Sequence, residues 1–169
     1  MTRAYLAFTE KGLALAQKLA SALPGTVDRC GHGGPSLADW AAEQFAHADA
    51  LIFVGAVGIA VRAIAPHCRS KAVDPAVVVL DECGHFAVPI LSGHLGGAND
   101  LARALAAVCG AVPVITTATD ANGVFAVDAW ARHQNCAVLE PERIKRVSSR
   151  LLAGGPVRYR SEFPVAGQA

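Results

Sequence analysis

The segment Ser92–Asp100 places several chemically active side chains at the start of a predicted helix. It follows an apolar run over residues 86–91, which predicts a strand. A strand that ends in a glycine-rich turn before a helix exposes backbone N–H groups, which suit carboxylates or phosphates. The turn also offers the Ser92 hydroxyl, the His94 imidazole and the Asn99 carboxamide. We therefore expect a binding or catalytic site here.

His94 is the candidate for proton transfer in this segment, because imidazole titrates near neutral pH. The alternative is that His94 is only a cap or a surface residue. Ser92 lacks the Gly-x-Ser-x-Gly context of a hydrolase nucleophile, and no Gly-Lys-Ser/Thr follows that would indicate a nucleotide-binding P-loop. Ser92, Gly96, Gly97 and Asn99 are therefore expected to bind substrate rather than to attack it.

A second polar segment follows the apolar run over residues 112–115. Thr116, Thr117 and Thr119 lie within four positions and are followed by Asp120. The threonines are either turn hydroxyls or one edge of a binding site, and Asp120 is either a helix cap or a base. We expect the threonines to bind substrate and Asp120 to share the catalytic role with His94.

A third loop, Gly55–Gly58, follows the apolar run over residues 51–54. The two glycines are typical either of a tight turn or of a ligand loop, and the third glycine of a dinucleotide-binding motif is absent. Arg62, Arg69 and Lys71 are either surface charges or anchors for substrate carboxylates. We expect Gly55, Gly58 and Arg62 to bind substrate.

Composition limits the class of protein. The 169 residues are 53% hydrophobic and 17% charged with a net charge of +1, which favours a globular domain and argues against nucleic-acid or membrane-surface binding. No uncharged apolar run approaches the roughly 20 residues of a membrane span. Five cysteines without a C-x-x-C pair indicate reduced thiols rather than a metal site. We expect a cytoplasmic protein with no bound metal.

Predicted strands and helices alternate, which is typical of an α/β fold with a mostly parallel sheet flanked by helices, of Rossmann or flavodoxin type. Residues 76–80 and 85–91 predict one β-hairpin. Further strands are predicted over residues 136–139 and 157–160. Because ligands bind beyond the carboxyl ends of parallel strands, the loops at 55–58, 92–100 and 116–123 are expected to converge on one cleft.

The sequence resembles the CbiG family of cobalamin biosynthesis in four segments that occur in the family's order. These segments are Val54–Pro66, Asp74–Glu82, Leu91–Asn99 and Pro113–Asp120. The resemblance implies an N-terminal α/β domain over residues 1–122 and a small middle region over residues 123–169. It also implies that the family's C-terminal domain is absent from this chain.

The resemblance further implies cobalt-precorrin-5A hydrolase activity, which opens the δ-lactone of a cobalt tetrapyrrole and releases acetaldehyde. Cobalt is part of the substrate, so no cofactor of the protein is expected. The expected partners are the tetrapyrrole, a separate C-terminal-domain protein and a second copy of the chain. Two alternatives stay open: a non-catalytic tetrapyrrole-binding module, and an unrelated enzyme acting on a small molecule such as a sugar phosphate.

For lactone hydrolysis, we expect His94 or Asp120 to activate water. Backbone N–H groups near Gly96 and Gly97, with a threonine hydroxyl, are expected to stabilise the oxyanion. The helix starts at Gly55–Gly58 and Gly96–Asn99, with Arg62, are expected to hold substrate carboxylates.

Overall fold

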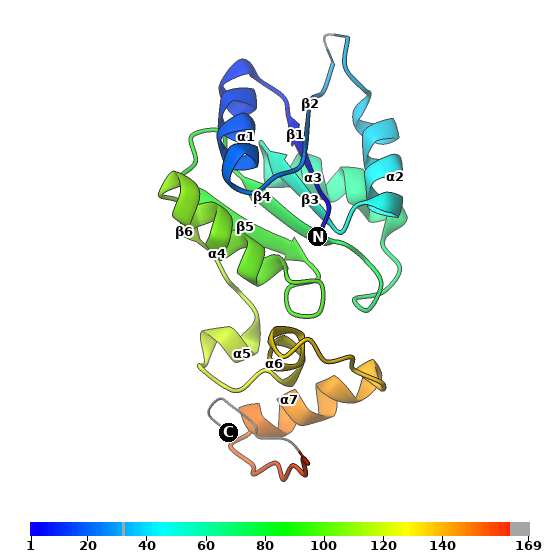
Figure 1. The fold of residues 1–169 in the computed structure, drawn as a ribbon, viewed down its shortest axis with the longest axis vertical. Coiled ribbons are helices and arrows are strands. Elements are labelled where there is room, and N and C mark those ends of the chain that lie inside the picture. Colours follow the sequence, from blue (N-terminus) through cyan, green and yellow to red (C-terminus); the bar gives the residue numbers. More distant parts are fainter. Residues whose placement is uncertain (32, 163–169) are drawn as a thin grey trace. The chain divides into compact units, whose positions relative to one another are not determined.

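The computed structural model describes residues 1–31 and 33–162. The chain divides into two compact units, Met1–Val114 and Ile115–Ala169 (Figure 1). We expected the division after residue 122. Residues 163–169 of the expected middle region lie outside the described residues.

The first unit contains a six-stranded sheet in the order β2-β1-β3-β4-β5-β6. The strands are β1 (Arg3–Ala7), β2 (Thr26–Arg29), β3 (Ala50–Val54), β4 (Ala76–Leu80), β5 (Phe86–Leu91) and β6 (Val112–Pro113). The first four strands are parallel, and β4 and β5 form an antiparallel hairpin. The predicted α/β class with a mostly parallel sheet is confirmed, and the order β2-β1-β3-β4-β5 is that of flavodoxin-like folds.

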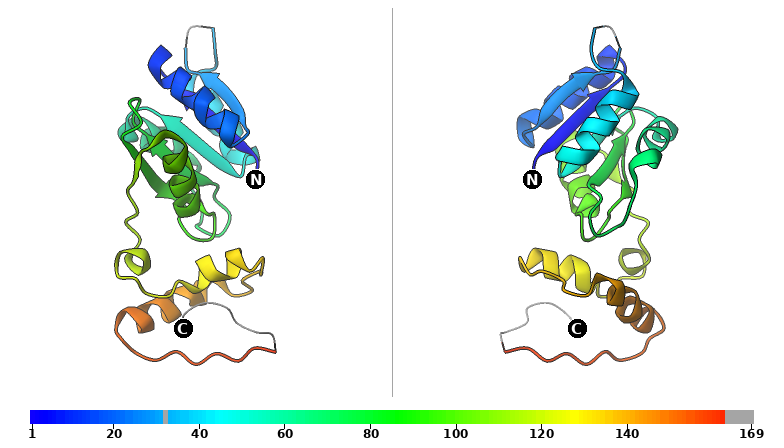
Figure 2. Two further views of the ribbon diagram at one scale, coloured as in Figure 1. Left: turned by 60° about the vertical axis from the view of Figure 1, so that its left-hand side comes forward. Right: turned by 90° about the vertical axis from the view of Figure 1, so that its right-hand side faces the viewer.

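Four helices cover the two faces of this sheet (Figures 1 and 2). Helices α1 (Glu10–Ala22) and α4 (Ala98–Cys109) pack on one face, and α2 (Leu37–His47) and α3 (Val57–Ile64) pack on the other. A short 3-10 turn, η1 (Ala65–His67), follows α3. The hydroxyls of Thr9 and Ser36 cap α1 and α2 by accepting backbone N–H bonds of 3.0 and 3.1 Å.

The core lies around β3 and β4, whose residues are all buried. On the α2–α3 face, Trp40 packs edge-on against Phe53 at a ring-centroid distance of 5.3 Å, and Leu6 and Val79 lie beside them. Strands buried on both faces read as continuous apolar runs, which is why the sequence identifies them.

The direction of β5 divides the loops between two edges of the sheet. Strands β1, β3 and β4 end at one edge, which we call the carboxyl edge, and the Gly55–Gly58 loop lies there. Because β5 runs antiparallel to β4, Leu91 pairs with Val77 near the start of β4, so Ser92–Asp100 follows at the opposite, amino edge. The prediction that these two loops converge on one cleft is therefore wrong.

The second unit is helical in its described part. It contains α5 (Ala118–Ala121), α6 (Val127–His133), the 3-10 turn η2 (Pro141–Arg143) and α7 (Ile144–Leu152). The strands predicted over 136–139 and 157–160 do not form, and β6 is shorter than predicted. Leu139 is 91% exposed and Tyr159 is 66% exposed, so these side chains lie in irregular segments that join no sheet. Among the described helices, none combines the length and apolar character needed to cross a bilayer.

Candidate functional site

The glycine-rich turn between β5 and α4 requires small residues at particular positions. Ser92 and Gly97 adopt left-handed conformations with φ of 54° and 82°. A Cβ atom at Gly96 would lie 2.4 Å from the Ser92 Cβ atom, so glycine is required there by close approach. The turn is therefore specified by its own packing.

Backbone hydrogen bonds close this turn. The N–H groups of Ala98 and Asn99 donate to the carbonyls of Ser92 and Gly93 at 3.1 and 3.0 Å, and the Gly97 N–H donates to the His94 carbonyl at 3.0 Å. The expectation of bare N–H donors here is wrong for these three groups, because the turn itself satisfies them. An oxyanion role for the Gly97 N–H would require the turn to open.

Ser92 ties the turn to the neighbouring loop. Its buried hydroxyl donates a 2.9 Å hydrogen bond to the Asp74 carbonyl. The Asp74 carboxylate in turn accepts the backbone N–H groups of Arg69 and Ser70 at 3.0 Å. Ser92 therefore has a structural role in holding two loops of the amino edge together.

A cavity of about 350 Å³ opens beside Asp74, between α2 and the loop that follows α3. Its lining residues are Ala42, Phe45, Ala46, Pro66, His67, Arg69, Val73 and Asp74. The His67 ring lies 5.8 Å from the Phe45 ring, and Arg69 is an exposed cation at the rim. The cavity can accept an apolar group that carries an anion. The sequence predicts Arg69 as either a surface charge or an anchor for a substrate carboxylate, and neither Arg69 nor His67 lies in a glycine-rich motif.

His94 and Asn99 lie within the same amino-edge turn. His94 is half-buried, and Asn99 is buried at 3% exposure. A half-buried imidazole beside a rigid turn can exchange protons with a ligand bound at this edge. Their predicted roles in catalysis and substrate binding stay predictions.

Gly55, Gly58 and Arg62 belong to a different part of the first unit. The Gly55 N–H donates to the Leu80 carbonyl at 2.8 Å. A Cβ atom at Gly55 would lie 2.7 Å from the Phe8 ring, so packing against Phe8 explains the glycine at this position. Gly58 is exposed in the first turn of α3, and Arg62 is exposed further along that helix. Their role in binding substrate stays a prediction.

The polar segment Thr116–Asp120 begins the second unit. The Thr117 hydroxyl donates a 2.6 Å hydrogen bond to an Asp120 carboxylate oxygen, while Thr119 is buried and Thr116 is exposed. This hydrogen bond orients the Asp120 carboxylate. His94 and Asp120 fall in different units, so their joint role stays a prediction.

Comparison with known proteins gives one consistent result. Residues 39–120 match the family model described as "Cobalamin synthesis G N-terminal". The chain is 42% identical to the cobalt-precorrin-5A hydrolase of Salmonella typhimurium over 88% of this chain and 45% of that protein. It is 41% identical to the cobalt-precorrin-5A hydrolase of Priestia megaterium over 60% of this chain and 27% of that protein.

A solved structure agrees with the fold. A cobalamin biosynthesis protein G homolog from Sulfolobus solfataricus superimposes with a TM-score of 0.58 and 23% identity, covering 96% of this chain and 51% of that one. The chain thus spans less than half the length of both curated relatives and about half of the solved structure.

Proposed function

Through residues 39–120 the chain belongs to the cobalamin synthesis G (CbiG) family, and we propose that it acts as a cobalt-precorrin-5A hydrolase. The observation that carries the proposal is the 42% identity to the Salmonella enzyme over 88% of this chain. In this proposal the chain binds the cobalt tetrapyrrole, opens its δ-lactone and releases acetaldehyde, leaving cobalt-precorrin-5B. The proposed location is the cytoplasm, where the five free cysteines stay reduced.

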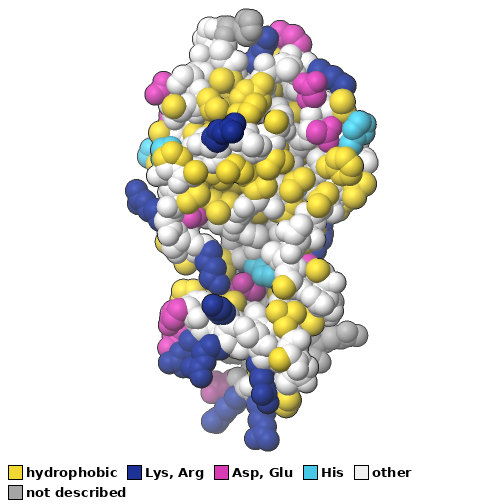
Figure 3. All heavy atoms as spheres, turned by 180° about the vertical axis from the view of Figure 1, so that it is seen from behind, with side chains coloured by type: hydrophobic (Ala, Val, Ile, Leu, Met, Phe, Trp, Pro, Cys, Tyr) yellow, Lys and Arg dark blue, Asp and Glu magenta, His cyan; other side chains and the backbone are white. Residues whose placement is uncertain are grey.

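The distribution of cations supports a substrate with many carboxylates. At the amino edge, Arg69 lies at the rim of the cavity and His67 lines it. In the second unit, Lys145, Arg146 and Arg150 are exposed on α7, and Figure 3 shows Lys and Arg side chains gathered over this unit. Guanidinium groups bind carboxylates through paired hydrogen bonds, so we assign Arg69 to one substrate carboxylate.

The first chemical step is attack of water on the lactone carbonyl. His94 or Asp120 takes the proton of that water, and the carbonyl oxygen becomes an oxyanion. Because the Gly97 N–H is already bonded within the turn, we assign oxyanion stabilisation to side-chain donors, with Asn99 as the candidate in the first unit. The carbon–oxygen bond of the lactone then breaks, which leaves a carboxylate and a hydroxyl on the substrate.

The second step releases the two-carbon fragment. A base removes the proton of the new hydroxyl, the adjacent carbon–carbon bond breaks, and its electron pair passes to the macrocycle. The fragment leaves as acetaldehyde, and a proton returns to the ring carbon. Cobalt is carried by the substrate, so the proposed reaction needs no cofactor of the protein.

The test is an assay of purified residues 1–169 with cobalt-precorrin-5A, in which acetaldehyde is trapped and substrate binding is followed by absorbance. We expect acetaldehyde release, and we expect His94→Ala to lower turnover about a hundredfold. His47→Ala, at an exposed histidine near the end of α2, is the matched control and should keep the wild-type rate. If the wild type neither binds cobalt-precorrin-5A nor releases acetaldehyde, the proposal is contradicted.

A second candidate function follows from the length of the relatives. The chain covers 45% of the Salmonella enzyme, so groups outside this stretch can belong to that protein's active site. In this case the chain binds the tetrapyrrole, and chemistry requires a separate C-terminal-domain polypeptide or a second copy of the chain. Tight binding without acetaldehyde release, restored by adding that polypeptide, would distinguish it from the first candidate.

A further inference from the structure

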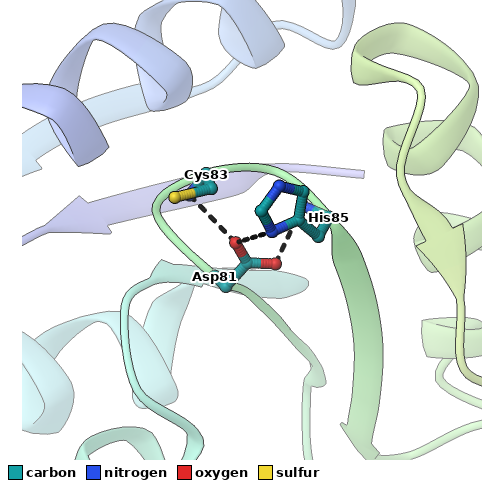
Figure 4. Close-up of side chains that lie close together, drawn as sticks. All are labelled: Asp81, Cys83 and His85. Atoms are coloured by element: carbon teal, nitrogen blue, oxygen red, sulfur yellow. Dashed lines mark hydrogen bonds and ion pairs between the residues drawn. The ribbon is translucent and has the colours of Figure 1, made fainter.

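Three metal-ligating side chains converge in the turn of the β4–β5 hairpin, at the carboxyl edge. Asp81, Cys83 and His85 alternate along the turn, and their ligand atoms lie within 4.8 Å of one another (Figure 4). We call these residues the hairpin triad. None of them belongs to the amino-edge turn or to the Thr116–Asp120 segment, so the proposed hydrolase chemistry does not use them.

The Asp81 carboxylate is held in a fixed orientation. One oxygen accepts the Cys83 N–H at 2.9 Å, and the other accepts the His85 and Phe86 N–H groups at 2.9 and 2.8 Å. These three N–H bonds hold the Asp81 carboxylate as the rigid side of the triad.

The other two members are adjustable and reachable from solvent. Cys83 and His85 are exposed, and the His85 Nδ1 atom lies 3.5 Å from an Asp81 oxygen. In a tetrahedral zinc site, bond lengths of 2.0–2.3 Å set ligand atoms roughly 3.5 Å apart. Small side-chain rotations of Cys83 and His85 would therefore complete the geometry.

A neighbouring lysine shows that the Cys83 sulfur can face a cation. The Lys11 Nζ atom lies 2.8 Å from the Cys83 sulfur. Lys11 is exposed on α1, so its side chain can move into solvent when a cation takes its place.

We propose that the hairpin triad binds Zn²⁺ through the Asp81 carboxylate, the Cys83 thiolate and a His85 ring nitrogen, with water in the fourth position. Sulfur and nitrogen donors favour zinc over Mg²⁺ or Ca²⁺, which prefer oxygen ligands. Any thiol proton leaves to solvent as the metal–sulfur bond forms. The role of Asp81 as a turn cap explains its three N–H bonds, but it does not explain why a thiol and an imidazole flank it.

The experiment is a titration of the full chain, reduced with a phosphine, with Co²⁺ alone as the spectroscopic probe. We expect one equivalent to produce a thiolate-to-cobalt charge-transfer band and visible bands typical of tetrahedral cobalt. Added Zn²⁺ should abolish both. Zinc should also raise the melting temperature, because a ligand that binds only the folded state stabilises it.

Two cysteine variants locate the site. Cys83→Ser should remove the charge-transfer band, while Cys136→Ser, at another exposed cysteine, should keep it. His85→Gln should weaken cobalt binding at least tenfold, in line with the loss of one ligand. Absence of a charge-transfer band in the wild type, or its persistence in Cys83→Ser, would overturn the proposal. Because the readout is metal binding, failure here leaves the hydrolase proposal unaffected.

Discussion

Gly96 lies where a side chain cannot be placed without moving Ser92. A Cβ atom there would meet the Ser92 Cβ atom at 2.4 Å and the Ser92 carbonyl oxygen at 2.8 Å. We therefore expect Gly96→Ala to lower the free energy of unfolding by about 1–3 kcal/mol, the usual cost of forcing atoms into a packed site. Urea denaturation followed by circular dichroism measures this change.

Gly58→Ala is the matched control for that substitution. No atom lies within 4 Å of a Cβ placed at Gly58, and its φ is not in the left-handed region. Alanine in a helix is more stable than glycine by roughly 0.5–1 kcal/mol, so Gly58→Ala should raise the free energy of unfolding. If Gly58→Ala also weakens tetrapyrrole binding, the predicted ligand role of Gly58 gains support. Equal effects of the two alanines on stability would contradict this reading of the turn.

Asp49 makes the stability of the first unit depend on pH. The Thr2 N–H donates a 2.6 Å hydrogen bond to the Asp49 carboxylate and lowers its pKa. A lowered pKa in the folded state stabilises the protein above the unfolded value of about 3.9, and this contribution is lost as pH falls through the folded pKa. We expect Asp49→Asn to be destabilised at pH 7 and to match the wild type at low pH.

Urea midpoints measured from neutral pH to about pH 2 test this expectation. Because the Asp49 side chain is 59% exposed, solvent screens the interaction and the effect should be modest. Glu43→Gln, at an exposed carboxylate on α2, controls for the loss of one charge. If the urea midpoint of Asp49→Asn falls at low pH as much as that of the wild type, the hydrogen bond from Thr2 does not contribute to stability.

At the scale of elements, the direction of strand β5 determines which cations lie near the glycine-rich turn. Because β5 is antiparallel to β4, the turn lies at the amino edge, where a hydrogen bond to Asp74 links it to the loop that carries Arg69. Arg62 lies on α3 and has no such link among the described contacts. Losing one charge-assisted hydrogen bond costs roughly 1.5–3 kcal/mol, or about tenfold or more in affinity.

We therefore expect Arg69→Ala to weaken cobalt-precorrin-5A binding at least tenfold and Arg62→Ala to weaken it less. Arg69→Ala keeps the backbone N–H bond to Asp74, so the loop itself should be preserved. Equilibrium titration of the two variants, followed by tetrapyrrole absorbance, measures the difference. A larger loss in Arg62→Ala would instead favour a site along α3 and the carboxyl edge.

The sequence could predict the strands of the sheet, but it did not predict which loops lie at the same edge of the sheet. Strand β4 has the predicted bounds because its residues form a continuous buried run. The predicted hairpin already implied that β5 reverses direction, so one shared cleft was incompatible with it. The apolar run over 136–139 predicted a strand wrongly, because so short a run carries no information about a pairing partner.

At the scale of the whole molecule, the candidate catalytic residues belong to two units of different construction. His94 lies in the sheet-containing unit, whose buried strands form the core, and Asp120 lies in the helical unit. Local packing explains Ser92, Gly55 and Gly96. The catalytic roles of His94 and Asp120 stay predictions, and kinetics can test whether the two residues act in the same step.

A double-mutant cycle supplies that test. We expect His94→Ala and Asp120→Asn each to lower turnover about a hundredfold. If both residues serve one proton transfer, the double variant should fall about a hundredfold as well, because the second change removes nothing further from the step. Acetaldehyde release at saturating cobalt-precorrin-5A is the measurement, and His94→Ala combined with His47→Ala is the control. A multiplicative loss of about ten-thousandfold would instead assign the two residues to separate steps.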